Sequence, residues 1–221
     1  MKPIEEADLR ALDEYRRSFS DAYAFVVHEV RVKMNISPTG RRVKSVSSIV
    51  AKLQRESIRL SQMQDIAGCR VVLQDIADQK KVAIEILEKI FPKTKLVDRR
   101  TNPSSGYRAT HVIVSVNGKP IEVQVRSSLQ HLWAEFSERL SDTDTAVKYG
   151  GGPKEIQDML STFSGLVLNV EENELKIASL EDTEGPILLE LQEEIKKQRE
   201  EIATLLKKYD DAQTKITRRS P

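Results

Sequence analysis

Apolar side chains recur every three or four residues along several long stretches of the chain, which is the spacing of one face of a helix. The first stretch runs from Leu12 to Val30 and predicts one long helix that ends before Pro38. The same spacing predicts further helices over residues 45–60, 79–91, 128–140, 154–179 and 186–215. We expect the last two to form a helical hairpin that packs within the chain, in preference to a helix that binds a partner.

Two other runs alternate between apolar and polar residues and are separated by Asn117-Gly118, a pair that favours a tight β-hairpin. They predict strands at 111–116 and 121–126, and a β-branched run predicts another strand at 68–73. A loop of two or four residues places six apolar residues on one face: Val112, Val114, Val116, Ile121, Val123 and Val125. The opposite face then carries His111, Ser115, Glu122, Gln124 and Arg126. An acid, an amide, a cation and an imidazole gathered on one face form a candidate site.

The helix predicted at 45–60 has a side of basic and hydroxyl residues. With the residue just before the helix, this basic stripe consists of Lys44, Ser48, Lys52, Arg55 and Arg59. Charges along a helix often form only a solvated face. This stripe is nearly free of acids, although the whole chain balances 35 Lys and Arg against 34 Asp and Glu. Because a polyphosphate requires locally clustered cations, the stripe is a candidate phosphate-binding face.

The composition excludes several classes of protein. The 221 residues, 39% of them hydrophobic, suffice for a domain with a sizeable core, and a net charge of +1 excludes a polybasic arm. One cysteine, Cys69, allows no intrachain disulfide, and three widely spaced histidines do not suit zinc hydrolysis. The glycine patterns of phosphate loops and dinucleotide sites do not occur. We expect a cytoplasmic location, because no apolar run approaches the ~20 residues of a membrane span and no signal segment is evident.

Two carboxylates placed near strands, Asp65 and Glu122, could together hold Mg²⁺, which prefers a few carboxylate oxygens combined with water and substrate phosphates. Cations of the basic stripe and Arg70 could neutralise a triphosphate, and Tyr107 after Gly106 could stack on a base. This set of groups predicts metal-dependent transfer of a phosphoryl-type group.

Five short motifs resemble, in their order, the synthetase domain of RelA/SpoT-type alarmone enzymes over about residues 40–150. They are Arg42-Val-Lys44-Ser45, Ser48-Ile49 with Lys52-Leu53 and Arg55, Asp65-Ile-Ala-Gly68-Cys-Arg70, Gly106-Tyr107-Arg108 with His111, and Glu122-Val-Gln124-Val-Arg126 with Trp133-Ala134-Glu135. The resemblance implies a stand-alone small alarmone synthetase of the α+β class. Its mixed sheet, related to that of nucleotidyltransferases, would be flanked by helices. The expected division is an N-terminal helical segment at 1–40, a synthetase core at 41–152 and a C-terminal helical extension at 153–221.

The same resemblance implies an activity and roles for individual residues. A GTP diphosphokinase would move pyrophosphate from ATP to the ribose 3′-hydroxyl of GDP or GTP, giving ppGpp or pppGpp, the alarmones of the stringent response, and AMP. Asp65 would hold Mg²⁺, and Glu122 would bind the metal or act as the base toward the 3′-hydroxyl. Residues implied to bind ATP are Arg42, Lys44, Ser48, Lys52, Arg55 and Arg70. Tyr107 would stack on the acceptor guanine, and the other implied acceptor-binding residues are His111, Gln124, Arg126 and Lys148.

Departures from the best-known small synthetases concentrate near the acceptor side. Ser127 replaces a usual threonine, Arg139 replaces a frequent histidine, and the segment at 148–152 differs. An alternative is therefore a toxic relative that pyrophosphorylates the 3′ end of tRNA or adenine nucleotides and has an antitoxin partner. Basic residues that could serve tRNA are Arg16, Arg17, Arg31, Lys33, Arg99 and Arg100. Another alternative is a non-catalytic nucleotide- or RNA-binding module. A homo-oligomer is expected by the resemblance.

Overall fold

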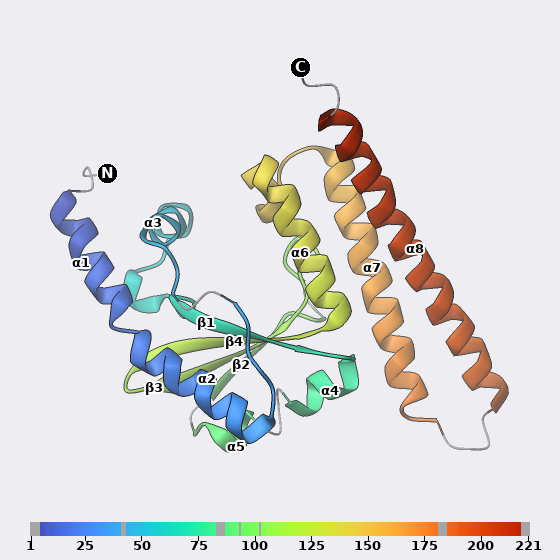
Figure 1. Ribbon diagram of the computed structural model, residues 1–221, viewed down its shortest axis with the longest axis horizontal. Coiled ribbons are helices and arrows are strands. Elements are labelled where there is room, and N and C mark those ends of the chain that lie inside the picture. Colours follow the sequence, from blue (N-terminus) through green and yellow to red (C-terminus); the bar gives the residue numbers. More distant parts are fainter. Residues whose placement is uncertain are drawn as a thin grey trace. The chain divides into compact units, whose positions relative to one another are not determined.

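The computed structural model describes residues 5–40, 43–82, 87–92, 94–101, 103–180 and 185–217 (Figure 1). The chain divides into two compact units. The first unit comprises residues 1–73, 79–98 and 109–126, and the second comprises residues 74–78, 99–108 and 127–221. Both units therefore take residues from the segment predicted as the synthetase core.

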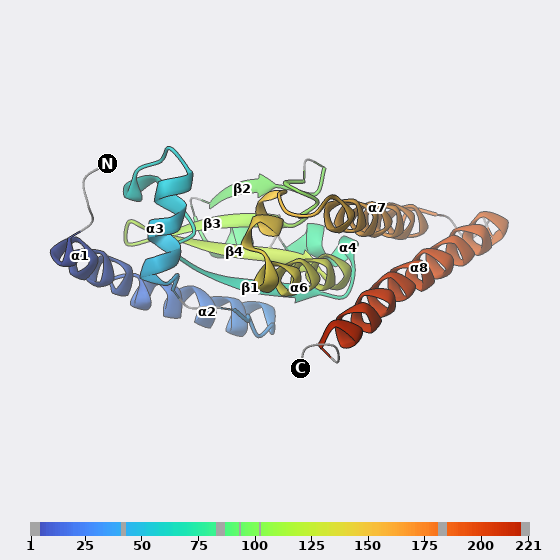
Figure 2. The ribbon, with the colours of Figure 1, turned by 90° about the horizontal axis from the view of Figure 1, so that it is seen from above.

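The first unit begins with two helices, α1 (Glu6–Arg17) and α2 (Ser20–Met34), which follow one another with a bend between them (Figure 2). The prediction of one long helix is therefore wrong at Ser18. Lys119 of the β-hairpin donates from Nζ to Ser18 Oγ at 2.8 Å, and it lies over the ring of Phe19 at 4.8 Å from the centroid. Because these contacts come from a residue about a hundred positions away, the local spacing of apolar residues could not reveal the break.

The next helix, α3 (Val46–Arg55), carries most of the basic stripe. It begins at Ser45, whose side chain accepts a hydrogen bond from the Ser48 backbone N–H at 3.2 Å and so satisfies a donor of the first turn. It ends at Glu56, which is extended, and a short 3-10 helix, η1 (Leu60–Gln62), follows. The helix is thus shorter than the predicted 45–60, and Arg59 lies outside it.

The first unit is built on a mixed sheet of four strands in the order β1-β4-β3-β2. The strands are β1 (Ala67–Leu73), β2 (Thr94–Asp98), β3 (Thr110–Val116) and β4 (Lys119–Ser127). β3 pairs antiparallel with both β2 and β4. β2 was not predicted, because it is a short edge strand whose residues are exposed or only half-buried and show no clear alternation. The α+β class with flanking and C-terminal helices is confirmed.

The hairpin register confirms the predicted division of β3 and β4 into two faces. Val112 pairs with Val123, and His111 pairs with Gln124 across the two-residue turn. The apolar face is buried except at Val116, which is partly buried, and it packs with α2 residues Val26 and Val30 in one core cluster. The opposite face carries the polar side chains of the candidate site.

Most of the span predicted as a helix at 79–91 is helical where the structure describes it. α4 (Ile76–Lys80) begins before the predicted start, residues 81–82 continue as a π-helical turn, and α5 (Leu87–Ile90) ends near the predicted end; residues 83–86 lie outside the described residues. Within the described part of the chain, we find no helix whose length and apolar content would suit a membrane span.

The second unit is mainly helical. It contains α6 (Ser128–Thr143), the 3-10 helix η3 (Thr145–Tyr149), α7 (Lys154–Ile177) and α8 (Gly185–Thr217). Figures 1 and 2 show α8 beside α7, and Ile202 of α8 is buried with Trp133, Phe136 and Phe163. The two C-terminal helices therefore form the hairpin predicted from their spacing, and its apolar face is used within the unit.

Candidate active site

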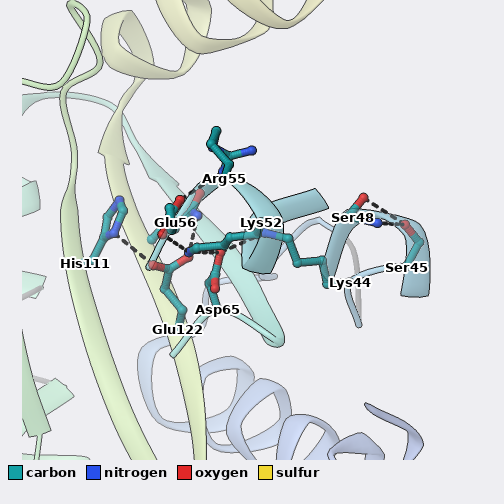
Figure 3. A network of polar contacts seen from close by, with 10 residues as sticks. Lys44, Ser45, Ser48, Lys52, Arg55, Glu56, Asp65, His111 and Glu122 are labelled. Atoms are coloured by element: carbon teal, nitrogen blue, oxygen red, sulfur yellow. Dashed lines mark hydrogen bonds and ion pairs between the residues drawn. The ribbon is translucent and has the colours of Figure 1, made fainter. Parts of the chain in front are cut away.

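Asp65, which lies just before β1, is held by two lysines of the α3 region (Figure 3). Its Oδ2 lies 2.8 Å from Lys44 Nζ and 2.9 Å from Lys52 Nζ. Burial raises the pKa of the Asp65 carboxyl, but the hydrogen bonds and charges of the lysines lower it more, so the net shift is downward. Its other oxygen, Oδ1, is buried and has no hydrogen-bond partner within the described residues. Asp65 is therefore an ionised carboxylate with one oxygen left for a further ligand.

Glu122 lies on the polar face of β4, where both of its carboxylate oxygens have partners. Oε1 is 2.9 Å from His111 Nδ1 on the neighbouring strand β3. Oε2 accepts a hydrogen bond from Gln124 Nε2 at 2.6 Å, and Gln124 Oε1 accepts one from Arg126 Nη2 at 2.8 Å. Because residues two apart in a strand point to the same face, the motif Glu-x-Gln-x-Arg forms a hydrogen-bonded row.

The two carboxylates interact with each other. Burial raises the pKa of Glu122, the contacts with His111 and Gln124 lower it, and the negative charge of Asp65 raises it by a smaller amount; the net shift is downward. Figure 3 shows the carboxyl groups of Asp65 and Glu122 near the end of the Lys52 side chain. Two acids that are 57 positions apart thus face the same cations.

Gly68 explains how β1 comes this close to Glu122. A Cβ atom added at Gly68 would lie 2.6 Å from the Glu122 backbone oxygen and 3.3 Å from its Cβ. Any larger residue would force the strand away. We predicted no role for Gly68 from the sequence. A glycine within a predicted strand could have indicated it, because such a glycine often marks the close approach of another backbone segment. The neighbouring Cys69 is buried, and burial raises the pKa of its thiol to about 12, so it remains a packed, protonated thiol.

The other residues predicted to bind ATP have varied surroundings. Ser48 accepts a hydrogen bond from Ser45 Oγ at 2.8 Å within the N-terminal cap of α3. Arg55 donates to Glu56 Oε1 at 2.9 Å, and Lys52 lies 3.9 Å from the other oxygen of Glu56. Arg70 lies on β1 two residues after Gly68. Arg42 lies outside the described residues. The basic stripe is nearly free of acids in the sequence, but the adjacent Glu56 contacts two of its residues and folding brings Asp65 to two of them.

The residues predicted to bind the acceptor fall in both units. His111, Gln124 and Arg126 belong to the first unit and contact Glu122 or each other, as described above. Tyr107 and Lys148 belong to the second unit. There the Tyr107 ring lies 6.4 Å from the Trp133 ring, and Lys148 is exposed on η3.

The donor set of the first unit fits a magnesium ion. The described residues contain no cluster of three or more His, Cys, Asp or Glu side chains that could form an all-protein cage. Mg²⁺ instead takes one or two carboxylates together with water and substrate phosphates. The buried, unpartnered Oδ1 of Asp65, beside an ionised Glu122, supplies this kind of ligand.

Known proteins with similar sequences share this region. A family described as "Region found in RelA / SpoT proteins" matches residues 41–141. An uncharacterized protein of Mycobacterium tuberculosis is 34% identical over 119 residues, and the chain covers 44% of its length. GTP pyrophosphokinase YjbM of Bacillus subtilis is 31% identical over an alignment of 150 positions, which covers 59% of this chain and 66% of that protein. The chain thus spans less than half the length of the mycobacterial relatives that it matches.

A solved structure has a similar fold. Small alarmone synthetase 1 from Bacillus subtilis, bound to its product pppGpp, matches with a TM-score of 0.57 and 26% identity. The match covers 75% of this chain and 96% of that chain.

Proposed function

This chain belongs to the RelA/SpoT family and is homologous to small alarmone synthetases over most of its length, and on that premise we propose that it is a GTP diphosphokinase. It moves the β,γ-pyrophosphate of ATP to the ribose 3′-hydroxyl of GDP or GTP, and the products are (p)ppGpp and AMP. The proposed role is alarmone synthesis in the stringent response, and the proposed compartment is the cytoplasm.

The observation that supports this proposal is that Asp65, just before β1, lies beside Glu122 of β4 and contacts Lys44 and Lys52. Both carboxyl groups have a lowered pKa, so both are ionised at neutral pH. Transfer of a pyrophosphoryl group depends on positioning and on neutralisation of phosphate charge rather than on covalent chemistry by the protein. Ionised acids for a metal beside cations for phosphates are the groups that such a reaction requires.

In our proposal, the residues of the first unit have different roles in the reaction. Lys44, Lys52, Arg55 and Arg70 neutralise the triphosphate, and Asp65 and Glu122 hold Mg²⁺. When bound, Mg²⁺ neutralises charge that builds on the transferring group. The lowered pKa makes Glu122 a weak base, so its role toward the acceptor is mainly to orient the 3′-hydroxyl through a hydrogen bond. His111 and Gln124 keep its carboxylate in one orientation.

The acceptor is proposed to be a guanosine nucleotide, with Tyr107 stacking on the base and Lys148 contributing a positive charge. Binding of tRNA would require free cations outside this site. Several of the candidates for that purpose are engaged in ion pairs: Arg16 and Arg17 with Asp13, and Lys33 with Glu29. These pairs favour the nucleotide over tRNA.

Label transfer from ATP tests the proposal directly. The protein is incubated with γ-labelled ATP, Mg²⁺ and, in parallel, GDP, GTP, GMP, an adenine nucleotide or tRNA, and the products are separated. We expect the label in ppGpp or pppGpp, with AMP released in equal amount. Label on tRNA alone would show that tRNA, and not a guanosine nucleotide, is the acceptor. Label on adenine nucleotides alone would show that the acceptor is an adenine nucleotide.

Removal of the Asp65 charge distinguishes the proposed enzyme from a non-catalytic binding module. We expect Asp65→Asn to abolish magnesium-dependent AMP release, because the variant loses a metal ligand. Asp142→Asn is the matched control, since Asp142 is exposed on α6, and it should keep full activity. A wild-type protein that binds ATP but never releases AMP would instead be a non-catalytic module.

A further inference from the structure

Lys44 and Lys52 form ion pairs with Asp65, the carboxylate that we propose as a metal ligand. Both ammonium groups contact the same atom, Asp65 Oδ2, at 2.8 and 2.9 Å. The three side chains are only partly exposed, at 27% for Lys44, 20% for Lys52 and 21% for Asp65. Solvent therefore screens this cluster less than it would screen a surface ion pair.

This arrangement opposes a divalent cation when no nucleotide is present. The two ammonium groups already balance the charges of the Asp65 and Glu122 carboxylates, and a cation bound at the unpartnered Oδ1 would lie next to both ammonium groups. Like charges at such short distances repel strongly in a partly buried site. The lysines thus hold Asp65 ionised and, at the same time, lower its affinity for a free metal ion.

A triphosphate changes the balance because it offers the lysines other anionic partners. Lysine has a flexible stem and binds phosphate as a point charge, so its ammonium group can move without rebuilding the helix. Lys52 already lies 3.9 Å from a second acid, Glu56, so Asp65 is not the sole anionic partner of its ammonium group among the described residues. Once the ammonium groups turn to phosphate oxygens, the Asp65 carboxylate is left for the metal.

We infer that Lys44 and Lys52 form a counter-ion lock on Asp65, which makes metal binding at this carboxylate depend on the arrival of a triphosphate. This inference rests on the proposed function, because it takes Asp65 as a metal ligand and the lysines as phosphate ligands. The lock keeps the site from holding a metal ion without its nucleotide. By linkage, the metal and the nucleotide then increase each other's affinity.

The lock makes two opposite predictions for a single substitution, and Mn²⁺ is a suitable spectroscopic probe because it also prefers carboxylate ligands. In Lys52→Met, electron paramagnetic resonance should show tighter binding of Mn²⁺ alone, by roughly tenfold, within the about 5- to 150-fold range typical of coupled sites. Isothermal titration in EDTA should show weaker binding of α,β-methylene ATP. A merely structural defect would weaken both. Lys44→Met should behave in the same way and provides a second variant.

Two controls locate the effect. Lys33→Met removes a lysine from another carboxylate pair, Lys33 with Glu29 at 2.6 Å, and should change neither affinity. Asp65→Asn combined with Lys52→Met should show no gain in Mn²⁺ binding. If neither lysine variant binds Mn²⁺ more tightly than the wild type, the lock is refuted.

Failure of the lock and failure of the proposed function give different results. If the wild type transfers label but the lysine variants gain no Mn²⁺ affinity, only the lock is wrong. If no acceptor receives label but the Mn²⁺ and nucleotide results are as expected, the coupling stands in a binding module and the proposed reaction is wrong.

Discussion

Glu122 of the first unit and Glu171 of the second unit are both withdrawn from solvent, and burial raises the pKa of each carboxyl group. The net shifts nevertheless have opposite signs. Glu122 is contacted by His111 and Gln124, and its pKa is lowered overall. Glu171, on α7, accepts a hydrogen bond from Ser127 Oγ at 2.5 Å and one from Gln130 Nε2 at 2.9 Å, and its pKa remains raised.

The difference shows that burial alone does not decide the charge of an acid; its partners do. A hydroxyl and an amide satisfy the oxygens of Glu171, but these neutral donors do not outweigh the loss of hydration. In the first unit, an imidazole contacts Glu122 and two ammonium groups contact Asp65. The first unit therefore keeps ionised acids suited to bind a metal, and the second unit uses its buried acid to join the start of α6 to α7.

The same substitution in each unit should separate these roles. We expect Glu122→Gln to lower the rate of AMP release by about 10²-fold or more, because a proposed metal ligand and the carboxylate that orients the 3′-hydroxyl are lost. Glu171→Gln should keep most of the activity, since the hydrogen-bond partners of Glu171, Ser127 and Gln130, lie at the start of α6 in the second unit and a glutamine can still accept from them. Initial rates at saturating ATP would measure both. Equal losses would show that Glu122 and Glu171 do not differ in their roles.

Two glycines, one in each unit, allow the units to be compared by the free energy of unfolding of their alanine variants. Gly68→Ala should lower the free energy of unfolding by about 1–3 kcal/mol, because its Cβ would lie 2.6 Å from the Glu122 backbone oxygen. Gly165→Ala on α7 should instead raise it by up to about 1 kcal/mol, because it meets no atom within 4 Å and alanine favours the helix. Urea denaturation measures both. A stabilised Gly68→Ala variant would contradict the close approach of β1 and β4.

The smallest effect is expected in the pH dependence of stability. The lowered pKa of Glu122 means that its contribution is present above the unfolded-state value, near 4.5, and is lost as the pH falls through the folded-state pKa. The raised pKa of Glu171 means that its contribution is present below 4.5 and is lost as the pH rises through the folded-state pKa.

Substitution by glutamine removes each titration, so the two variants should diverge. As the pH rises to about 4.5, Glu122→Gln should become less stable relative to the wild type. As the pH rises above about 4.5, Glu171→Gln should become more stable relative to the wild type. Urea denaturation at several pH values gives the two slopes. Slopes of the same sign would be inconsistent with the opposite pKa shifts.

Much of the polar face of the sheet could be predicted from the sequence. Asn117-Gly118 predicted the turn, and the alternation on either side predicted that His111 and Glu122 share a face. Other features could not be predicted because they depend on distant residues. The break between α1 and α2 involves Lys119, and the early end of α3 left Arg59 outside the helix. Edge strand β2 lacked a pattern because solvent covers much of it.

The sequence by itself determined which side chains lie together along β3 and β4, because side chains alternate between the two faces of a strand and a two-residue turn fixes the pairing. Only the tertiary structure decided what those groups contact and which charge they carry. Lys44 and Asp65 are 21 residues apart, and no local rule sets the distance between them. Their contact depends on the pairing of the backbone before α3 with the start of β1, where Val43 pairs with Ala67 and the Lys44 N–H donates to the Ile66 oxygen, and the electrostatics of the candidate site follow from that pairing.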